Sequence, residues 1–238
     1  MDWRERYERA AARYAGGVTR KSDERQLVQL ANAAWAAGLS LLMAGDRVGA
    51  REWLVRAAAR YRESWDAGAE SDAWGRPIGA MKALLIAGED ASEAAHWTLE
   101  TCLGISYRDV SVSPVVARED ADEATCRADT GPGGTCLGIS YRDVSVSPVG
   151  RYAGVLALLV LGRDDEAGAV AAGLGEGFPG DVADALRALA AHDAEAYRAA
   201  VAAVRRSFEE REDFLEDMPV PDTALALEAL GERRRLGP

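Results

Sequence analysis

The sequence has few of the residues that build disulfide frameworks and metal centres. Its 238 residues include 3 cysteines and 2 histidines. The cysteine count is odd and no two cysteines have C-x-x-C spacing, which argues against a disulfide framework and a zinc ribbon. A Cys3His site can be drawn with His96, but no spacing requires it, so we expect reduced thiols. No Ser-His-Asp, H-E-x-x-H or EF-hand pattern occurs. We therefore expect no metal, no cofactor and no enzymatic activity.

Long apolar runs and positive charge are also scarce. No apolar run approaches the roughly 20 residues of a membrane span, and the N-terminal MDWRERYERAAARY is charged where a signal peptide would be apolar. Lys and Arg total 28 against 39 Asp and Glu, which leaves a net charge of -11. Nucleic acids and anionic membranes attract positive surfaces, so both are disfavoured as partners. We predict a cytoplasmic protein, for which a basic protein is the more plausible partner.

The residues that are abundant favour helices. Hydrophobic residues make up 48% and charged residues 28%, a balance that excludes a disordered chain. Phe totals only 3, whereas stretches rich in Ala, Arg, Glu and Leu recur throughout. No linker divides the chain. We predict a single all-α domain over residues 1–238.

A fifteen-residue segment occurs twice without change. TCLGISYRDVSVSPV occupies residues 101–115 and again 135–149, an offset of 34 residues. We interpret the duplication as an insertion at about 101–149 in an older framework. Thr101–Ile105 is expected to close one helix and Ser147–Gly150 to open the next.

The remainder of the insertion, Ser106–Val146, is expected to form an outlying loop. Its middle is compatible with a short helix at Ala117–Arg127. The alternation of apolar residues between Ile139 and Val146 also allows a small β-ribbon. A lone ribbon is only marginally stable, so the loop is the favoured interpretation.

One junction pattern recurs four times, as LLMAGDRVGA at 41–50, LLIAGEDASEAA at 84–95, LLVLGRDDEAGA at 158–169 and ALAAHDAEAYRAA at 188–200. In each, an apolar helix end meets Gly or His and then an acidic residue. Gly accepts the left-handed conformation that ends a helix, and Asp caps the next. Subtracting the 34-residue duplication leaves a period of about 40 residues, typical of helix-pair repeats. We predict antiparallel helical hairpins stacked as a degenerate TPR-like array.

The turn signals also predict where the helices begin and end. Expected helices cover residues 2–15, 22–44, 46–65, 92–103, 165–172, 181–191, 193–210 and 222–235. Their predicted N-caps include Ser22, Asp46, Asp181, Asp193 and Asp222. Pro77 and Pro148 are expected at the first helical position of two further helices.

The densest acidic segment is SFEEREDFLEDMPVPD at 207–222. It carries seven carboxylates, at Glu209, Glu210, Glu212, Asp213, Glu216, Asp217 and Asp222. Such a patch can attract a basic partner and speed its capture. The alternative is a solvated helix end in which Asp222 acts only as a cap.

All six tryptophans lie in the first 97 residues. Most fall on apolar stripes and are expected in the core. Trp65 and Trp74 flank the polar stretch DAGAESDA and are the expected exceptions, placed to line a peptide groove. The glycine-rich stretch 173–180 lacks the Lys-Ser/Thr ending of a phosphate-binding loop and is expected to be an interhelical turn.

Two C-terminal stretches carry a family resemblance. PVGRYAGVLALLVLGRDDEA at 148–167, followed by Ala-rich helices and SFEEREDFLEDMPVPDTALALEALGERR at 207–234, resembles the immunity protein 49 family. The likeness covers Gly150–Arg235 and, more weakly, Arg76–Asp90. It implies a helical cytoplasmic protein that binds and neutralises a cognate toxin without turnover. A TPR-like scaffold that binds a peptide or protein is the alternative.

Overall fold

The computed structural model describes residues 2–17, 23–70, 72–103 and 147–236, and the regular elements in these ranges are helices. They are α1 (Trp3–Gly17), α2 (Glu24–Met43), α3 (Arg47–Asp66), α4 (Gly75–Ala87), α5 (Ser92–Leu103), α6 (Pro148–Val160), α7 (Asp164–Ala171), α8 (Gly180–Ala190), α9 (Ala194–Glu209), the 3₁₀ helix η2 (Leu215–Asp217) and α10 (Asp222–Arg233). The predicted all-α class is confirmed. Most of the insertion, with its expected loop, short helix or ribbon, lies outside the described residues.

The same backbone turn closes the helix at each of the four predicted junctions. Its left-handed residue is Gly45, Gly88, Gly162 or His192, with φ between 55° and 84°. In each case this residue donates its N–H to the carbonyl three positions earlier at 3.0 to 3.2 Å, and the next residue donates to the carbonyl five positions earlier at 2.9 to 3.0 Å. This pair of bonds is the Schellman motif, which satisfies the last carbonyls of a helix. The four predicted junctions thus share one helix-ending turn. The predicted aspartate cap of the next helix is present at Asp46 and Asp193, but the cap residue of α7 is Arg163, whose side chain makes no cap hydrogen bond.

Three predicted helix starts are confirmed in atomic detail. The carboxylate of Asp46 accepts the N–H of Gly49 at 2.9 Å, and that of Asp193 accepts the N–H of Ala196 at 3.0 Å. Ser147 caps α6 through the N–H of Gly150, and Pro148 is the first helical residue. The second copy of the duplicated segment therefore opens a helix, as predicted, because serine and proline supply a cap and a preset φ.

Four other predicted starts are wrong by one or two residues. Asp23, and not Ser22, caps α2, because its carboxylate and Gln26 form a reciprocal capping box. Prolines 179 and 221 precede α8 and α10, so Asp181 and Asp222 are the second and first helical residues and are not caps. Helix α4 begins at Gly75, which places Pro77 third in the helix.

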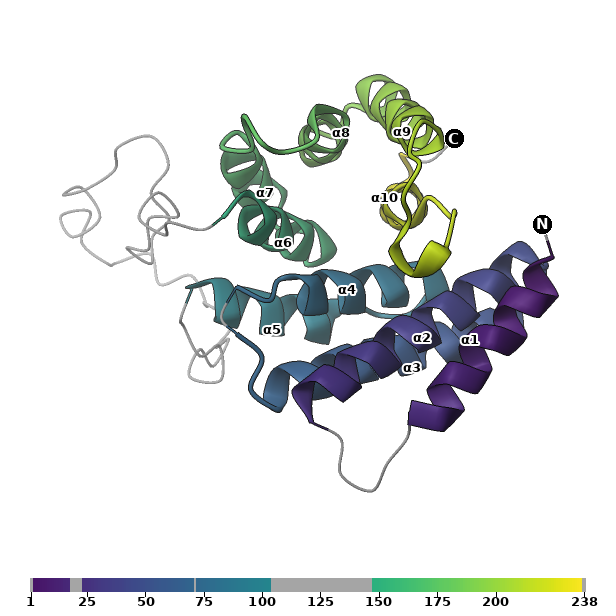
Figure 1. The fold of residues 1–238 in the computed structure, drawn as a ribbon. Coiled ribbons are helices and arrows are strands. Elements are labelled where there is room, and N and C mark those ends of the chain that lie inside the picture. Colours follow the sequence, from purple (N-terminus) through teal and green to yellow (C-terminus); the bar gives the residue numbers. More distant parts are fainter. Residues whose placement is uncertain (1, 18–22, 71, 104–146, 237–238) are drawn as a thin grey trace, which may run out of the picture.

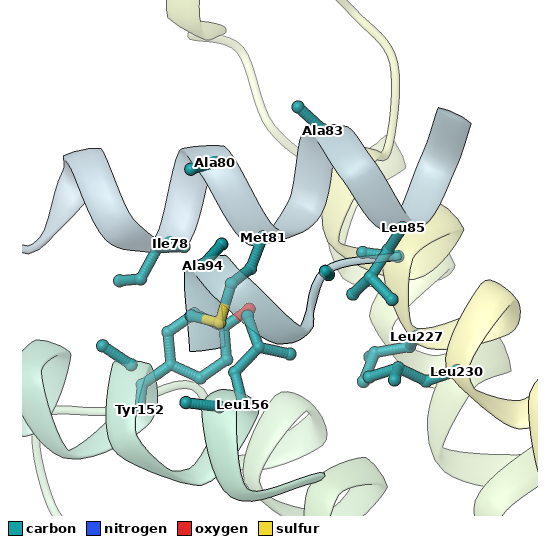
Figure 2. Packing of buried hydrophobic residues seen from close by; sticks show 14 of the residues in the cluster. Ile78, Ala80, Met81, Ala83, Leu85, Ala94, Tyr152, Leu156, Leu227 and Leu230 are labelled. Carbon is teal, nitrogen blue, oxygen red and sulfur yellow. The ribbon is translucent and has the colours of Figure 1, made fainter. Parts of the chain in front are cut away.

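The chain closes on itself. Figure 1 shows α1, α2 and α3 packed side by side, α4 above them, an arc from α6 to α9, and α10 between α9 and α4. Figure 2 shows Met81 of α4 next to Tyr152 and Leu156 of α6. Leu85, further along α4, faces Leu227 and Leu230 of α10. In an open repeat array each helix pair contacts only its neighbours. The hairpins are present, but α10 returns to the middle of the chain and packs against both α9, at one end of the arc, and α4.

Close helix packing in the core depends on glycine at particular sites. A Cβ atom added to Gly38 of α2 would lie 2.7 Å from Leu54 of α3, and one added to Gly231 of α10 would lie 2.6 Å from Tyr197 of α9. The α2–α3 pair and the α9–α10 pair are therefore closer together than a residue larger than glycine would permit at these two positions. Around these contacts one apolar cluster includes residues from helices α1 through α10.

Candidate protein-binding surface

The acidic segment predicted from the sequence forms an exposed loop after α9. We call residues 209–217 the acidic loop. Helix α9 ends at Glu209, and the rings of Phe208 and Phe214, 5.1 Å apart, pack across the turn that follows. Five of the seven predicted carboxylates are exposed here, namely Glu209, Glu210, Glu212, Asp213 and Asp217. The structure thus brings most of the predicted partner-binding residues to one surface.

The end of the acidic loop has an unusual backbone. Glu216 and Asp217 both have positive φ, 55° and 54°, in the region that favours glycine. Each such residue costs about 1 kcal/mol or more and persists only where its surroundings impose it. Here the buried Met218 and Val220 anchor the chain on one side, and α1 holds it on the other.

Two arginines of α1 hold the acidic loop. Arg13 forms an ion pair with the carboxylate of Glu216, and Arg6 donates to the backbone carbonyl of Asp217. The ion pair spans 203 positions of the chain, so no local pattern could have revealed it. Sequence reasoning placed Glu216 in the partner-binding set but missed that its carboxylate already has an internal partner.

The loop and α1 enclose a cleft of about 800 Å³. One wall carries Arg6, Arg9 and Arg13, and the other carries Glu212, Asp213, Glu216 and Asp217. The two walls have opposite charge, so the acidic surface is not uniformly available. A basic partner meets unopposed carboxylates on the outer side of the loop and competes with α1 inside the cleft.

Leu215 belongs to the same acidic loop, between Asp213 and Asp217 in the sequence. Its exposed fraction is 58%, although leucine is an apolar residue that normally favours burial. A single exposed apolar residue is ordinary on a protein surface. Here the residue lies within a row of exposed carboxylates, which matches the apolar centre and polar rim of protein interfaces.

Asp222 is not part of this surface. It is the first residue of α10, and its carboxylate forms an ion pair with Lys82 of α4, which is only 9% exposed and also donates to Thr223 at 3.0 Å. Burial raises the pKa of Tyr61 and Tyr152, and the charge of Asp222 adds to both increases. Asp222 therefore ties α10 to α4 within the closed fold, which corrects its grouping with the acidic loop.

The predicted tryptophan pair belongs to an internal aromatic cluster. Trp65 is half-buried, and its ring lies 6.4 Å from Trp74 and 5.9 Å from Trp97. Trp74 is only 7% exposed, so the expectation that it escapes the core is wrong. Helix α4 starts at the residue after Trp74, which brings the ring against the end of α3 instead of into solvent. Of the pair, only Trp65 retains appreciable exposure.

The glycine-rich stretch after α7 is an interhelical turn, as expected. Arg151 donates to the carbonyl of Gly173, and Arg187 donates to that of Leu174. The backbone carbonyl oxygens of the turn thus bind cations, whereas a phosphate-binding loop presents backbone N–H groups to an anion. Within the described ranges, no three His, Cys, Asp or Glu side chains form a cluster suited to a metal ion. No helix in the same ranges is long and apolar enough to span a bilayer.

Comparison of the chain with protein-family models, curated proteins and solved structures finds no match. The resemblance to the immunity protein 49 family therefore stands on the two sequence stretches alone. The physical character of the surface is independent of any relative. It consists of an exposed leucine, five exposed carboxylates and a backbone held by two arginines of α1.

Proposed function

We propose that this chain is a non-enzymatic immunity protein of the cytoplasm, which binds a cognate toxin and neutralises it through the acidic loop. The observation that carries the proposal is the acidic loop itself, in which Leu215 and five carboxylates are all exposed. The net charge of -11 favours a basic partner. The family resemblance points to the same role.

Binding alone accounts for neutralisation in this scheme. Carboxylates on the loop attract a basic surface over roughly 10 Å at moderate salt, which raises the rate of encounter. Leu215 then enters an apolar depression on the toxin and loses its contact with water. In the ion pair of Arg13 and Glu216, a carboxylate of the loop binds a guanidinium group. We expect an arginine of the toxin to bind the exposed carboxylates of the loop in the same way. No chemical step and no cofactor are required.

The loop conformation supports tight binding. Two left-handed residues and the contacts to α1 restrict the loop before a partner arrives. A preorganised loop loses less conformational freedom on binding than a flexible one, which strengthens affinity without additional contacts.

The test is neutralisation of a basic toxin domain encoded beside this gene, measured by survival of a bacterial host that expresses both proteins. The variant reverses the charge of Glu209, Glu210, Glu212 and Asp213 to lysine. The matched control reverses four exposed carboxylates elsewhere, Glu52, Glu93, Glu176 and Asp184. Both variants change the net charge equally, so they separate position from overall charge.

We expect the loop variant to lose protection and the control to keep it. Toxin affinity measured by calorimetry should fall at least about a hundredfold for the loop variant, because several favourable pairs become repulsive. Equal protection by both variants would exclude the acidic loop as the toxin-binding surface. Leu215→Asp provides a second variant, and its high exposure keeps the folded core unaffected.

The second candidate is a TPR-like scaffold for a peptide or protein partner. The four equivalent junctions support it, because helical hairpins of this kind recur in such scaffolds. The closure of α10 on α4 and the burial of Trp74 remove the open concave face on which the sequence-based version depended. Loss of peptide binding in Trp65→Ala, with toxin protection intact, would favour this candidate.

A further inference from the structure

A second groove differs in character from the acidic loop, because its surface is apolar and arginines border it. It has a volume of about 560 Å³ and is formed where the α2–α3 turn meets the end of α4 and the end of α10. We call it the hairpin groove. Its floor includes Leu42, Leu54, Leu85 and Ile86. It shares no lining residue with the cleft beside the acidic loop.

The helices that form the hairpin groove carry exposed apolar residues, one of which lines the groove. Val48 lines the groove and is 74% exposed, the highest value among the large exposed hydrophobic residues in the described ranges. Met43 and Val55, from the end of α2 and from α3, are also exposed. Apolar surface in and around a groove is stabilised when another surface covers it.

The rim of the hairpin groove carries Arg47, Arg51 and Arg233 together with Glu232. Arg51 pairs with Glu89, and Arg233 donates to the backbone carbonyl of Glu89. Arg47 forms no ion pair with any residue that the structure describes. Three guanidinium groups thus face two carboxylates, Glu89 and Glu232, which leaves the rim positive. The occupant that fits is an apolar side chain flanked by carboxylates.

The same chain presents that occupant. Leu215 is exposed within the acidic loop, and the charge of the molecule is divided accordingly. Residues 1–103, which supply most of the groove lining, are nearly neutral, with 14 Lys and Arg against 15 Asp and Glu, whereas residues 147–236 contain 10 against 17. Oppositely charged surfaces on one chain attract two copies in a head-to-tail arrangement.

We propose that a second copy of this chain docks its acidic loop in the hairpin groove of the first. Leu215 of the second copy then lies over the apolar floor, and the carboxylates of its acidic loop lie beside Arg47 and Arg233 of the first copy. The contact joins two different surfaces, so it is heterologous. Each copy keeps one free loop and one free groove, and association therefore continues into rings or chains. Self-association covers the acidic loop, and a toxin that binds the loop competes with it.

The test uses two variants that disable one surface each. The groove variant is Arg47→Glu with Arg233→Glu, and the loop variant is Leu215→Asp. The wild-type protein should increase in mean mass with concentration in analytical ultracentrifugation at about 0.05 M salt, and dissociate at about 0.5 M salt, where charges are screened. Each variant alone should remain monomeric, with association at least about tenfold weaker.

Mixing the two variants gives the decisive result. The loop variant retains an intact groove and the groove variant retains an intact loop, so together they should form one heterodimer that cannot grow further. Val48→Glu is a second groove variant, whose exposed position cannot disturb the core. A wild-type protein that stays monomeric to about 1 mM, a concentration at which even weak contacts are populated, would overturn the proposal. A mixture that forms no heterodimer would overturn it as well.

The outcome is separable from the toxin-binding proposal. The groove variants keep the acidic loop intact, so they should neutralise the toxin as well as the wild-type protein does. Loss of self-association with toxin protection retained supports both proposals. Absence of self-association in the wild-type protein rejects the head-to-tail contact and leaves the toxin experiment unaffected.

Discussion

Arg13 of α1 and Glu216 of the acidic loop form an ion pair across 203 positions of the chain. This pair links the first helix to the turn that precedes the last, and it holds a residue with positive φ in place. Helix α1 is thus part of the candidate binding surface even though its own sequence carries no recognisable signal for that role.

Removing this ion pair should loosen the acidic loop without unfolding the protein. Arg13→Ala is expected to lower the free energy of unfolding by at most about 1 kcal/mol, because exposed ion pairs contribute little. Hydrogen exchange of the Asp217 and Met218 amides should accelerate about fivefold, since these amides bond within the held turn. Arg9→Ala is the control, as Arg9 lines the same cleft without a described ion pair. Equal exchange in both variants would contradict the assigned role of Arg13.

The pair of Lys82 and Asp222 should be necessary for the closure of α10 on α4. Breaking it with Lys82→Met is expected to cost about 3 to 5 kcal/mol, because the carboxylate of Asp222 loses its partner in a largely buried site. The double variant with Asp222→Leu should recover most of that loss, since no buried charge then remains. Urea denaturation of the two single variants and the double variant measures the coupling. Additive losses would show that the two side chains act independently.

His192 occupies the left-handed position that glycine fills at the other three junctions. His192→Gly is expected to stabilise the protein by up to about 1 kcal/mol, because glycine adopts φ 55° without a Cβ penalty. The substitution removes the contact of His192 Nε2 with the carboxylate of Asp164, but the imidazole is more than half exposed and that contact contributes little. The reciprocal variant Gly88→Ala should destabilise by about 1 kcal/mol. Thermal denaturation measures both, and a destabilised His192→Gly would show that the contact to Asp164 dominates.

Three tyrosines should resist ionisation at alkaline pH. Burial is the main cause that raises the pKa of Tyr61, Tyr152 and Tyr197 above the ordinary value of 10.0. The folded state thus prefers the neutral phenol, so these residues contribute stability below pH 10.0 and lose it as the pH rises toward their folded pKa. Tyrosinate absorbance during an alkaline titration should show delayed ionisation until unfolding. In Tyr61→Phe the delayed fraction should fall by one residue, and an unchanged fraction would contradict the assignment.

The helices and their junctions could be predicted because their causes are local. A left-handed glycine, an aspartate cap and an apolar stripe each act within a few residues. The structure therefore confirms the predicted roles of Gly45, which ends α2, and Asp46, which caps α3. The errors at Ser22, Asp181 and Asp222 are also local in origin. In each case a neighbouring Asp or Pro competes for the cap position, and the sequence does not rank the competitors.

The candidate surface was predictable only in its composition. The sequence by itself determined that acidic residues surround Leu215, that the chain is helical and that four junctions share one turn. The tertiary structure alone decided that Arg13 holds Glu216, that Lys82 removes Asp222 from the surface and that Trp74 is buried. The physical reason is distance along the chain. Caps and turns arise from neighbouring residues, whereas ion pairs and burial depend on which helix the completed fold brings alongside.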